Sequence, residues 1–228
     1  MNKIDIEKLL SSKIKNSKLY KDSLTHRSAS NENNERLEFF GDAILGFYIA
    51  EYLFEKFPDD NEGDLSRKRS YLVRKETLSK IAINFHLGKK IILGEGERKS
   101  GGNKRDSIIA DALEALIAVV YLIDGAEETR LFIRKVFDGF IKTLPSNDNL
   151  KDSKTKLQEL LQSHNCELPL YDTTELNKKN RISFRTYCKI IEYNINEDGT
   201  GSNKRKSQQE AALKALNKLS EIFKKENA

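Results

Sequence analysis

The sequence has few of the features that mark exported, membrane-spanning or repetitive proteins. Its two cysteines and three scattered histidines are too few for a disulfide framework or a zinc motif. The longest apolar run, residues 115–123, is shorter than the roughly 20 residues that a membrane-spanning helix needs. Only 3 prolines and 12 glycines are present, which excludes a collagen-like chain. We therefore expect a globular protein without a membrane span.

The first residues also lack a signal for export. MNKIDIEKLLSS has neither an apolar segment nor a small-residue cleavage site, which together with the few cysteines predicts a cytoplasmic protein. The chain carries 40 Lys and Arg against 35 Asp and Glu, giving a net charge of +5 and a pI near 9.0. A surplus this small permits nucleic-acid binding without demanding it. The placement of the charges is therefore more informative than their sum.

Residues 1–144 are predicted to be almost entirely helical. Apolar residues recur at helical spacing in five segments, residues 4–10, 37–57, 66–85, 107–123 and 127–144. Glycine or proline separates these segments, for example at Pro58 and Gly125. The glycine-containing stretch 94–102 lacks the ending of a phosphate-binding loop and does not follow a strand, so we expect a plain loop there.

A different pattern follows a polar linker at residues 145–151. Within residues 152–226 the sequence predicts, in order, a helix, three strands and a final helix, at residues 154–163, 170–176, 182–193, about 194–199 and about 206–224. The expected fold is thus an all-α N-terminal domain, residues 1–144, followed by a small α+β domain of order α-β-β-β-α.

Paired acids lie on two of the apolar helices in the first domain. Glu38 and Asp42 are spaced i and i+4, so both side chains leave one face of the helix, and Glu35 lies one turn earlier. Asp111 and Glu114 are spaced i and i+3 in an otherwise aliphatic segment. Acids in such surroundings should be at least partly buried, which is costly unless a cation compensates them.

Two facing pairs of acids predict a shared cation, because clustered carboxylates raise one another's pKa. All-oxygen ligation favours a hard ion, Mg²⁺ or Mn²⁺. One alternative is that the acids are ordinary solvated surface charges, as most acids are. Another is a di-iron site in a helical oxidoreductase, which would require Glu-x-x-His motifs that neither pair has.

The residues around these acids resemble the signature of the ribonuclease III family. Residues 34–42, Asn-Glu-Arg-Leu-Glu-Phe-Phe-Gly-Asp, are closely similar to that signature, except that Phe40 stands where the family commonly has leucine. The similarity continues in order through LTHRS at 24–28, EGDLS at 62–66, KSGG at 99–102 and DSIIADALE at 106–114. These motifs are long, and the resemblance covers essentially the whole chain in order.

The resemblance implies an endoribonuclease that hydrolyses double-stranded RNA, leaving 5′-phosphate and 3′-hydroxyl ends with a short 3′ overhang. It further implies ribosomal RNA precursors and structured messages as substrates, Mg²⁺ (or Mn²⁺) as cofactor and no organic cofactor. By motif position the metal ligands are Glu38, Asp42, Asp111 and Glu114. The residues expected to act in cleavage are Glu35, Asp42, Glu62 and Glu114.

The second domain resembles a double-stranded-RNA-binding domain. The resemblance places the RNA contacts at Thr155, Gln158 and Glu159 of the first helix and at Lys204, Arg205 and Lys206 before the last. Basic residues at a helix start suit phosphate binding, although a basic cluster on its own can equally be a solvated face. The family usually has histidine where this chain has Asn180, so that loop is expected to bind RNA more by charge than by shape.

The family resemblance also implies a homodimer in which each chain cuts one strand of the duplex. Phe39, on the signature helix, is the expected dimer contact, and the alternative is an ordinary core phenylalanine. The expected partners are double-stranded RNA and a second copy of the chain, with no membrane. A non-catalytic RNA-binding protein on the same fold is the remaining alternative, and the presence of all six acids argues against it.

Overall fold

The computed structural model describes residues 5–178 and 181–226, and the chain divides into two compact units between Pro145 and Ser146. Each unit has its own hydrophobic core. None of the helices in the described residues is long and apolar enough to cross a membrane. The expectation of a helical first part followed by an α+β second part is confirmed.

The first unit is helical, and two long helices form its centre. Its α-helices are α1 (Ser12–Lys15), α2 (Lys18–Leu24), α3 (Glu35–Lys56), α4 (Glu62–Val73), α5 (Lys75–Asn84), α6 (Glu95–Lys99) and α7 (Asp106–Lys142). Three short 3₁₀ helices are η1 (Ile6–Leu9), η2 (Leu87–Lys89) and η3 (Gly102–Lys104). Helix α7 packs against α3 and α5. Its first half is buried almost all round, because the segment that follows Ser107 is nearly all aliphatic.

The helix predicted over residues 66–85 is wrong in one respect, because the chain forms two helices there. Arg74 has extended backbone angles (φ −68°, ψ 147°) and separates α4 from α5. The Arg74 side chain donates from Nε to Thr77 Oγ1 at 3.1 Å and lies over the ring of Tyr71. Neither glycine nor proline marks this break, so no local pattern predicts it.

Other boundaries differ less. The expected break at Gly125 is present, since this residue has φ 86° and ψ −175° inside α7, a backbone region open mainly to glycine. The stretch 94–102, expected to be a plain loop, contains the one-turn helix α6. The first predicted helix, over residues 4–10, is the 3₁₀ helix η1, and the short helices α1 and α2 were not predicted.

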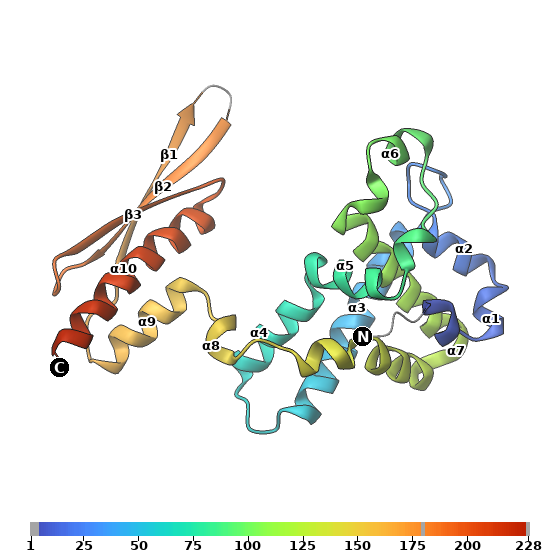
Figure 1. The fold of residues 1–228 in the computed structure, drawn as a ribbon, viewed down its shortest axis with the longest axis horizontal. Helices are drawn as coiled ribbons and strands as arrows, with labels where there is room; N and C mark the ends of the chain where they lie inside the picture. Colours follow the sequence, from blue (N-terminus) through green and yellow to red (C-terminus); the bar gives the residue numbers. More distant parts are fainter. Residues whose placement is uncertain (1–4, 179–180, 227–228) are drawn as a thin grey trace. The chain divides into compact units, whose positions relative to one another are not determined.

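The second unit is a three-stranded antiparallel sheet packed against two helices (Figure 1). Its elements are α8 (Asn147–Leu150), α9 (Ser153–Ser163), β1 (Leu170–Lys178), β2 (Arg181–Ile190), β3 (Ile195–Gly201) and α10 (Lys204–Glu226). The strand order is β1-β2-β3, with Thr186 opposite Thr173 on one side and Gly199 on the other. The segment predicted as a linker contains α8 and belongs to this unit from Ser146 onward.

Candidate active site

Three carboxylates from two helices converge in the first unit. Glu38 projects from the first turns of α3, and Asp111 and Glu114 project from the first turns of α7. One carboxylate oxygen from each lies within 4.8 Å of the others. Glu114 is only 5% exposed, while Glu38 and Asp111 are half-buried. The structure therefore brings together three of the four residues predicted as metal ligands.

The close packing of α3 on α7 depends on a glycine in the signature. A Cβ atom on Gly41 would lie 1.8 Å from the backbone carbonyl oxygen of Glu114, so only glycine fits at this point. By contrast, a Cβ atom on Gly46, further along the same helix, would meet nothing within 4 Å. Gly41 thus sets the distance between Glu38 on one helix and Glu114 on the other.

The three remaining predicted acids are all exposed, contrary to the partial burial expected for Glu35 and Asp42. Asp42 lies one turn after Glu38, and its charge contributes to the raised pKa of Glu114. The Glu35 carboxylate pairs with Arg27 at 3.4 Å. The exposure of these three acids agrees with the alternative that they are ordinary surface charges. Glu114 does not fit that alternative, because it is buried.

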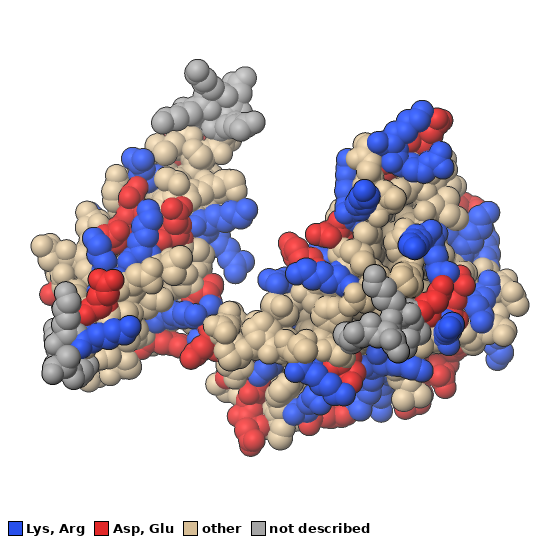
Figure 2. Space-filling view, viewed as in Figure 1, with Lys and Arg blue, Asp and Glu red and all other residues tan. Residues whose placement is uncertain are grey.

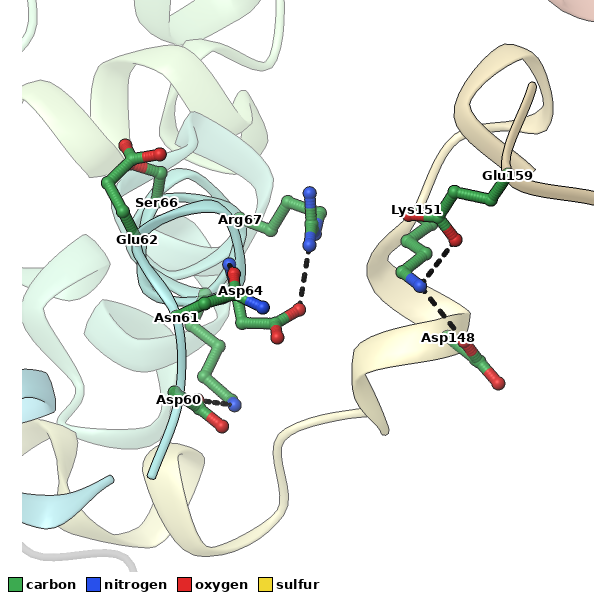
Figure 3. A network of polar contacts seen from close by, with 10 residues as sticks. Asp60, Asn61, Glu62, Asp64, Ser66, Arg67, Asp148, Lys151 and Glu159 are labelled. Carbon is green, nitrogen blue, oxygen red and sulfur yellow. Dashed lines mark hydrogen bonds and ion pairs between the residues drawn. The ribbon is translucent and has the colours of Figure 1, made fainter. Parts of the chain in front are cut away.

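Glu62 lies at a different place on the first unit. It is the first residue of α4, and its Oε1 accepts a hydrogen bond from Ser66 Oγ at 2.8 Å. Figure 3 shows the two side chains next to each other. It lines an open cleft of about 760 Å³ together with Phe47 and Phe54 of α3. The three-carboxylate cluster among the described residues does not include it.

The electrostatics of the cluster favour bound positive charge. Burial, followed by the charges of Asp42, Asp111 and Glu38, raises the pKa of Glu114 to about 8. Burial and the Asp111 charge also raise the pKa of Glu38. Both shifts mean that the ionised forms of these carboxylates are short of compensating charge.

Lys75 supplies part of that charge, and the sequence analysis did not identify it. Its Nζ atom lies 2.7 Å from Asp111 Oδ1 and 3.8 Å from Glu38 Oε1. It is the first residue of α5, placed there by the helix break at Arg74. No sequence signal marked it, because the contact joins residues 36 apart across an unpredicted break.

The residues of the cluster suit a divalent metal ion. Its ligand atoms are all carboxylate oxygens, the donor type that Mg²⁺ and Mn²⁺ prefer, and it includes no histidine of the kind a di-iron site requires. One half-exposed lysine cannot balance three carboxylates. Asp111 and Glu38 also border an open cleft of about 790 Å³ whose walls carry Arg27 and Arg105. The cleft therefore offers both acidic and basic side chains to a nucleic-acid backbone that enters it.

His26 belongs to the wall of this cleft, and its contacts are local. Its Nδ1 atom lies 2.8 Å from Ser28 Oγ, and that hydroxyl oxygen in turn accepts from the backbone N–H of Gly94 at 3.0 Å. These bonds tie the 24–28 motif to the loop before α6. The arrangement agrees with a structural role for His26.

In the second unit, the described residues among the predicted RNA contacts lie on two packed helices. Thr155, Gln158 and Glu159 are on α9, and Lys204, Arg205 and Lys206 form the exposed first turn of α10. The two helix starts are linked because the Lys154 backbone N–H donates to Gln209 Oε1 at 3.2 Å. The structure thus places the two groups on neighbouring helices, whereas Asn180 lies outside the described residues.

The first turn of α10 is held in place by its neighbours. Asn203 Oδ1 accepts from the backbone N–H of Lys206 at 2.9 Å, which caps the helix. A Cβ atom on Gly199 would lie 2.3 Å from the backbone nitrogen of Ala211, so glycine lets β3 approach α10. On the face in Figure 2, basic and acidic side chains are interspersed, so an RNA-binding surface is not evident from charge alone.

Glu159 is already engaged within this unit. Lys151 Nζ lies 2.6 Å from Glu159 Oε2 and 3.4 Å from Asp148 Oδ1, and Figure 3 shows the lysine between the two acids. Lys151 falls in the segment predicted as a linker, and the sequence analysis gave it no role. It holds the carboxylate of one predicted RNA contact.

An apolar stripe runs along the exposed side of α3. Phe39 is 81% exposed, so the alternative that it is an ordinary core residue is wrong for this chain. Phe47 and Phe54 are 63% and 72% exposed, and the spacing of the three residues places them within one side of the helix. Exposed phenylalanines in a row are typical of a surface that another chain covers.

Comparisons with known proteins agree with this two-part arrangement. A family model described as ribonuclease-III-like matches residues 16–139, and one described as a double-stranded RNA binding motif matches residues 153–219. Ribonuclease 3 of Buchnera aphidicola subsp. Acyrthosiphon pisum (strain Tuc7) is 46% identical over 215 residues, which is 94% of this chain and 95% of the relative. Ribonuclease 3 of Histophilus somni (strain 2336) is 42% identical over 215 residues, covering 94% and 96%.

Among solved structures, the nuclease domain of ribonuclease III from Campylobacter jejuni is similar to the first unit. It is 40% identical in sequence, with a TM-score of 0.56, over 59% of this chain and 94% of that one. That structure is described as having structural flexibility in a region involved in dimer formation. Taken together, the family matches and the relatives that align over nearly their whole length show that this chain belongs to the ribonuclease III family.

Proposed function

We propose that the chain is a metal-dependent endoribonuclease that cuts both strands of double-stranded RNA. The observation that carries this proposal is the convergence of Glu38, Asp111 and Glu114 within 4.8 Å, beside an open cleft with basic walls. The matched double-stranded RNA binding motif supports the choice of substrate.

We propose products with 5′-phosphate and 3′-hydroxyl ends and short 3′ overhangs, and substrates that include ribosomal RNA precursors and structured messenger RNAs. The family membership supports these details. The site of action is the cytoplasm, a compartment consistent with two free cysteines. Sequencing RNA ends from cells with and without the protein identifies the targets. Precursors that mature normally without the protein would contradict this choice of substrates.

Each acid in the cluster has a proposed task. Glu38, Asp42, Asp111 and Glu114 would hold the metal ion. When bound, Mg²⁺ would supply Lewis acidity toward the scissile phosphate and would make water a better nucleophile. Glu114 is anchored against α3 by the close approach at Gly41, which orients its carboxylate toward Glu38. Arg27 and Arg105 border the cleft and would bind the phosphates on either side of the cut.

The second unit is proposed to hold the duplex. Lys204, Arg205 and Lys206 would contact phosphates together with the backbone N–H groups of the first turn of α10. Thr155, Gln158 and Glu159 would contact the minor groove, whose 2′-hydroxyls distinguish RNA from DNA. We also propose an RNA contact by Asn180.

We propose a homodimer formed through the apolar stripe of α3. The exposure of Phe39 supports this surface, and so does the dimer-forming region described for the Campylobacter jejuni nuclease domain. The catalytic role proposed for Glu62 depends on this dimer, since Glu62 lies beside Phe47 and Phe54 of the stripe. The proposed catalytic acids are Glu35, Asp42, Glu62 and Glu114.

Cleavage of an end-labelled RNA duplex tests the proposed activity. We expect cuts in both strands with Mg²⁺ or Mn²⁺ and none with EDTA, and terminal analysis should find 5′-phosphates. If the protein binds the duplex but does not cut it in Mg²⁺, the chain is an RNA-binding protein without catalytic activity. Cleavage that persists in EDTA would remove the metal from the proposal.

A mixed dimer tests the division of labour between the two chains. One chain is wild type and the other carries Glu38→Ala and Asp42→Ala, and two affinity tags allow the heterodimer to be purified. We expect it to cut one strand at each site and leave the other intact, because each chain has one set of acids. Cleavage of both strands by the purified heterodimer would show that one chain is sufficient.

A further inference from the structure

Lys75 occupies the acidic cluster in a way that a bound metal ion would disturb. Its ammonium nitrogen lies 2.7 Å from Asp111 Oδ1, which is hydrogen-bond distance, and 3.8 Å from Glu38 Oε1. These are two of the three carboxylates that converge within 4.8 Å. The lysine therefore contacts the oxygens that the proposed metal would use.

The position of Lys75 on its helix allows its side chain to leave. It is the first residue of α5, directly after the extended Arg74, and its side chain is 52% exposed. A long, half-exposed lysine can swing into solvent without disturbing the core. The ammonium group of Lys75 is a cation at neutral pH, and it donates its hydrogen bond to the Asp111 carboxylate.

We infer that Lys75 is a built-in counter-ion of the metal-free site, which the metal must displace from Asp111 and Glu38 before it binds. A divalent cation held by these carboxylates would place two positive charges close to the ammonium group, and like charges at that separation repel strongly. Lys75 would thus weaken metal binding, while it stabilises the cluster when no metal is present. This inference rests on the proposed metal-dependent function.

Three variants separate this role from a general effect of charge. Lys75→Gln removes the cation and keeps a polar side chain, and Lys75→Arg keeps the charge. Lys80→Gln makes the same charge change at an exposed position on the same helix, away from the cluster. A fourth variant, Asp111→Asn, identifies the binding site. Mn²⁺ binding is attributed to the acidic cluster only if Asp111→Asn abolishes it.

The measurement is Mn²⁺ binding to the RNA-free, full-length protein, followed by electron paramagnetic resonance. We expect Lys75→Gln to lower the Mn²⁺ dissociation constant roughly threefold to tenfold, the range that loss of a half-exposed ion pair corresponds to. Lys75→Arg and Lys80→Gln should remain close to wild type. In the metal-free state, Lys75→Gln should unfold at a lower temperature than Lys80→Gln, and saturating Mg²⁺ should remove this difference.

Two results would overturn the inference while leaving the metal site in place. Equal Mn²⁺ affinity of wild type and Lys75→Gln would show that the lysine does not compete with metal. Weaker affinity in Lys75→Gln would show instead that the lysine positions Asp111 for binding. If the wild type shows no Mn²⁺ binding that depends on Asp111, both this inference and the proposed metal site are overturned.

Discussion

The two units gather charge in opposite ways. In the first unit, acids distant in the sequence meet in a partly buried cluster, where Glu114 is only 5% exposed. In the second unit, Lys204, Arg205 and Lys206 are consecutive and exposed on one helix turn. Buried carboxylates are costly unless positive charge compensates them, whereas exposed basic residues cost little and are screened by salt. The difference suggests a division of labour in which one unit performs the chemistry and the other supplies affinity.

The largest expected effect is a loss of RNA cleavage that leaves RNA affinity unchanged. Glu114→Gln should slow cleavage at least about a hundredfold, because a metal ion contributes several kcal/mol to the transition state and each 1.4 kcal/mol is tenfold. RNA binding should change little, since phosphate contacts dominate affinity. Glu128→Gln, at an exposed position on the same helix, is the matched control. Near-wild-type cleavage by Glu114→Gln would refute its assignment as a ligand.

The second expected effect is a loss of RNA affinity. The triple variant Lys204→Gln, Arg205→Gln and Lys206→Gln should bind RNA at least about tenfold more weakly near 0.15 M salt. The slope of log affinity against log salt should fall by about 2 to 3, close to one for each lost phosphate contact. Titrations at several salt concentrations measure both quantities, with Lys224→Gln, toward the far end of α10, as control. An unchanged slope would mean that these residues do not meet phosphates.

The third effect concerns how the cluster is assembled. Gly41→Ala should lower the free energy of unfolding by about 1–3 kcal/mol, the range for overpacking, because its Cβ would meet the Glu114 carbonyl oxygen at 1.8 Å. Cleavage should fall as α3 moves away from α7. Gly46→Ala is the control on the same helix, and it should be neutral or stabilising by up to about 1 kcal/mol. Equal denaturation midpoints for the two variants would contradict the packing argument.

The smallest effect concerns stability without metal. Burial and neighbouring acids raise the pKa of Glu114 to about 8, above its ordinary value of 4.5. Between these values the folded protein binds the extra proton, so the free energy of unfolding falls as pH rises. Glu114→Gln should therefore stabilise the metal-free protein by about 1–2 kcal/mol at pH 9 and by less at pH 5. Denaturation at both pH values with EDTA tests this, and equal effects would contradict it.

Local sequence patterns predicted much of the fold and part of the candidate site. Helical spacing and the break at Gly125 predicted α3 and α7, and the one-turn spacing of Asp111 and Glu114 predicted that they share a face. The convergence of these acids with Glu38 depends on Gly41, whose role appears only once α3 packs on α7. Because that contact is tertiary, spacing alone predicts the pairs of acids and not their separation.

The features that sequence reasoning missed share a physical cause. Lys75 reaches the cluster because the chain breaks at Arg74 without glycine or proline, so no local propensity marked it. The exposure of Asp42 could not be predicted, since α3 carries apolar residues on its buried and its exposed sides. Glu62 matched a family motif, yet its place beside Phe47 is a property of how α4 packs on α3.

One experiment tests the division of labour most directly. A single RNA duplex is bound in Ca²⁺ and then cleaved in Mg²⁺ at saturating protein, using wild type, Glu114→Gln and the triple basic variant. We predict that Glu114→Gln binds within about twofold of wild type and does not cleave. The triple variant should bind weakly but cleave at close to the wild-type rate once saturated. A triple variant that stays slow at saturation, or a Glu114→Gln protein that cleaves normally, would contradict the account.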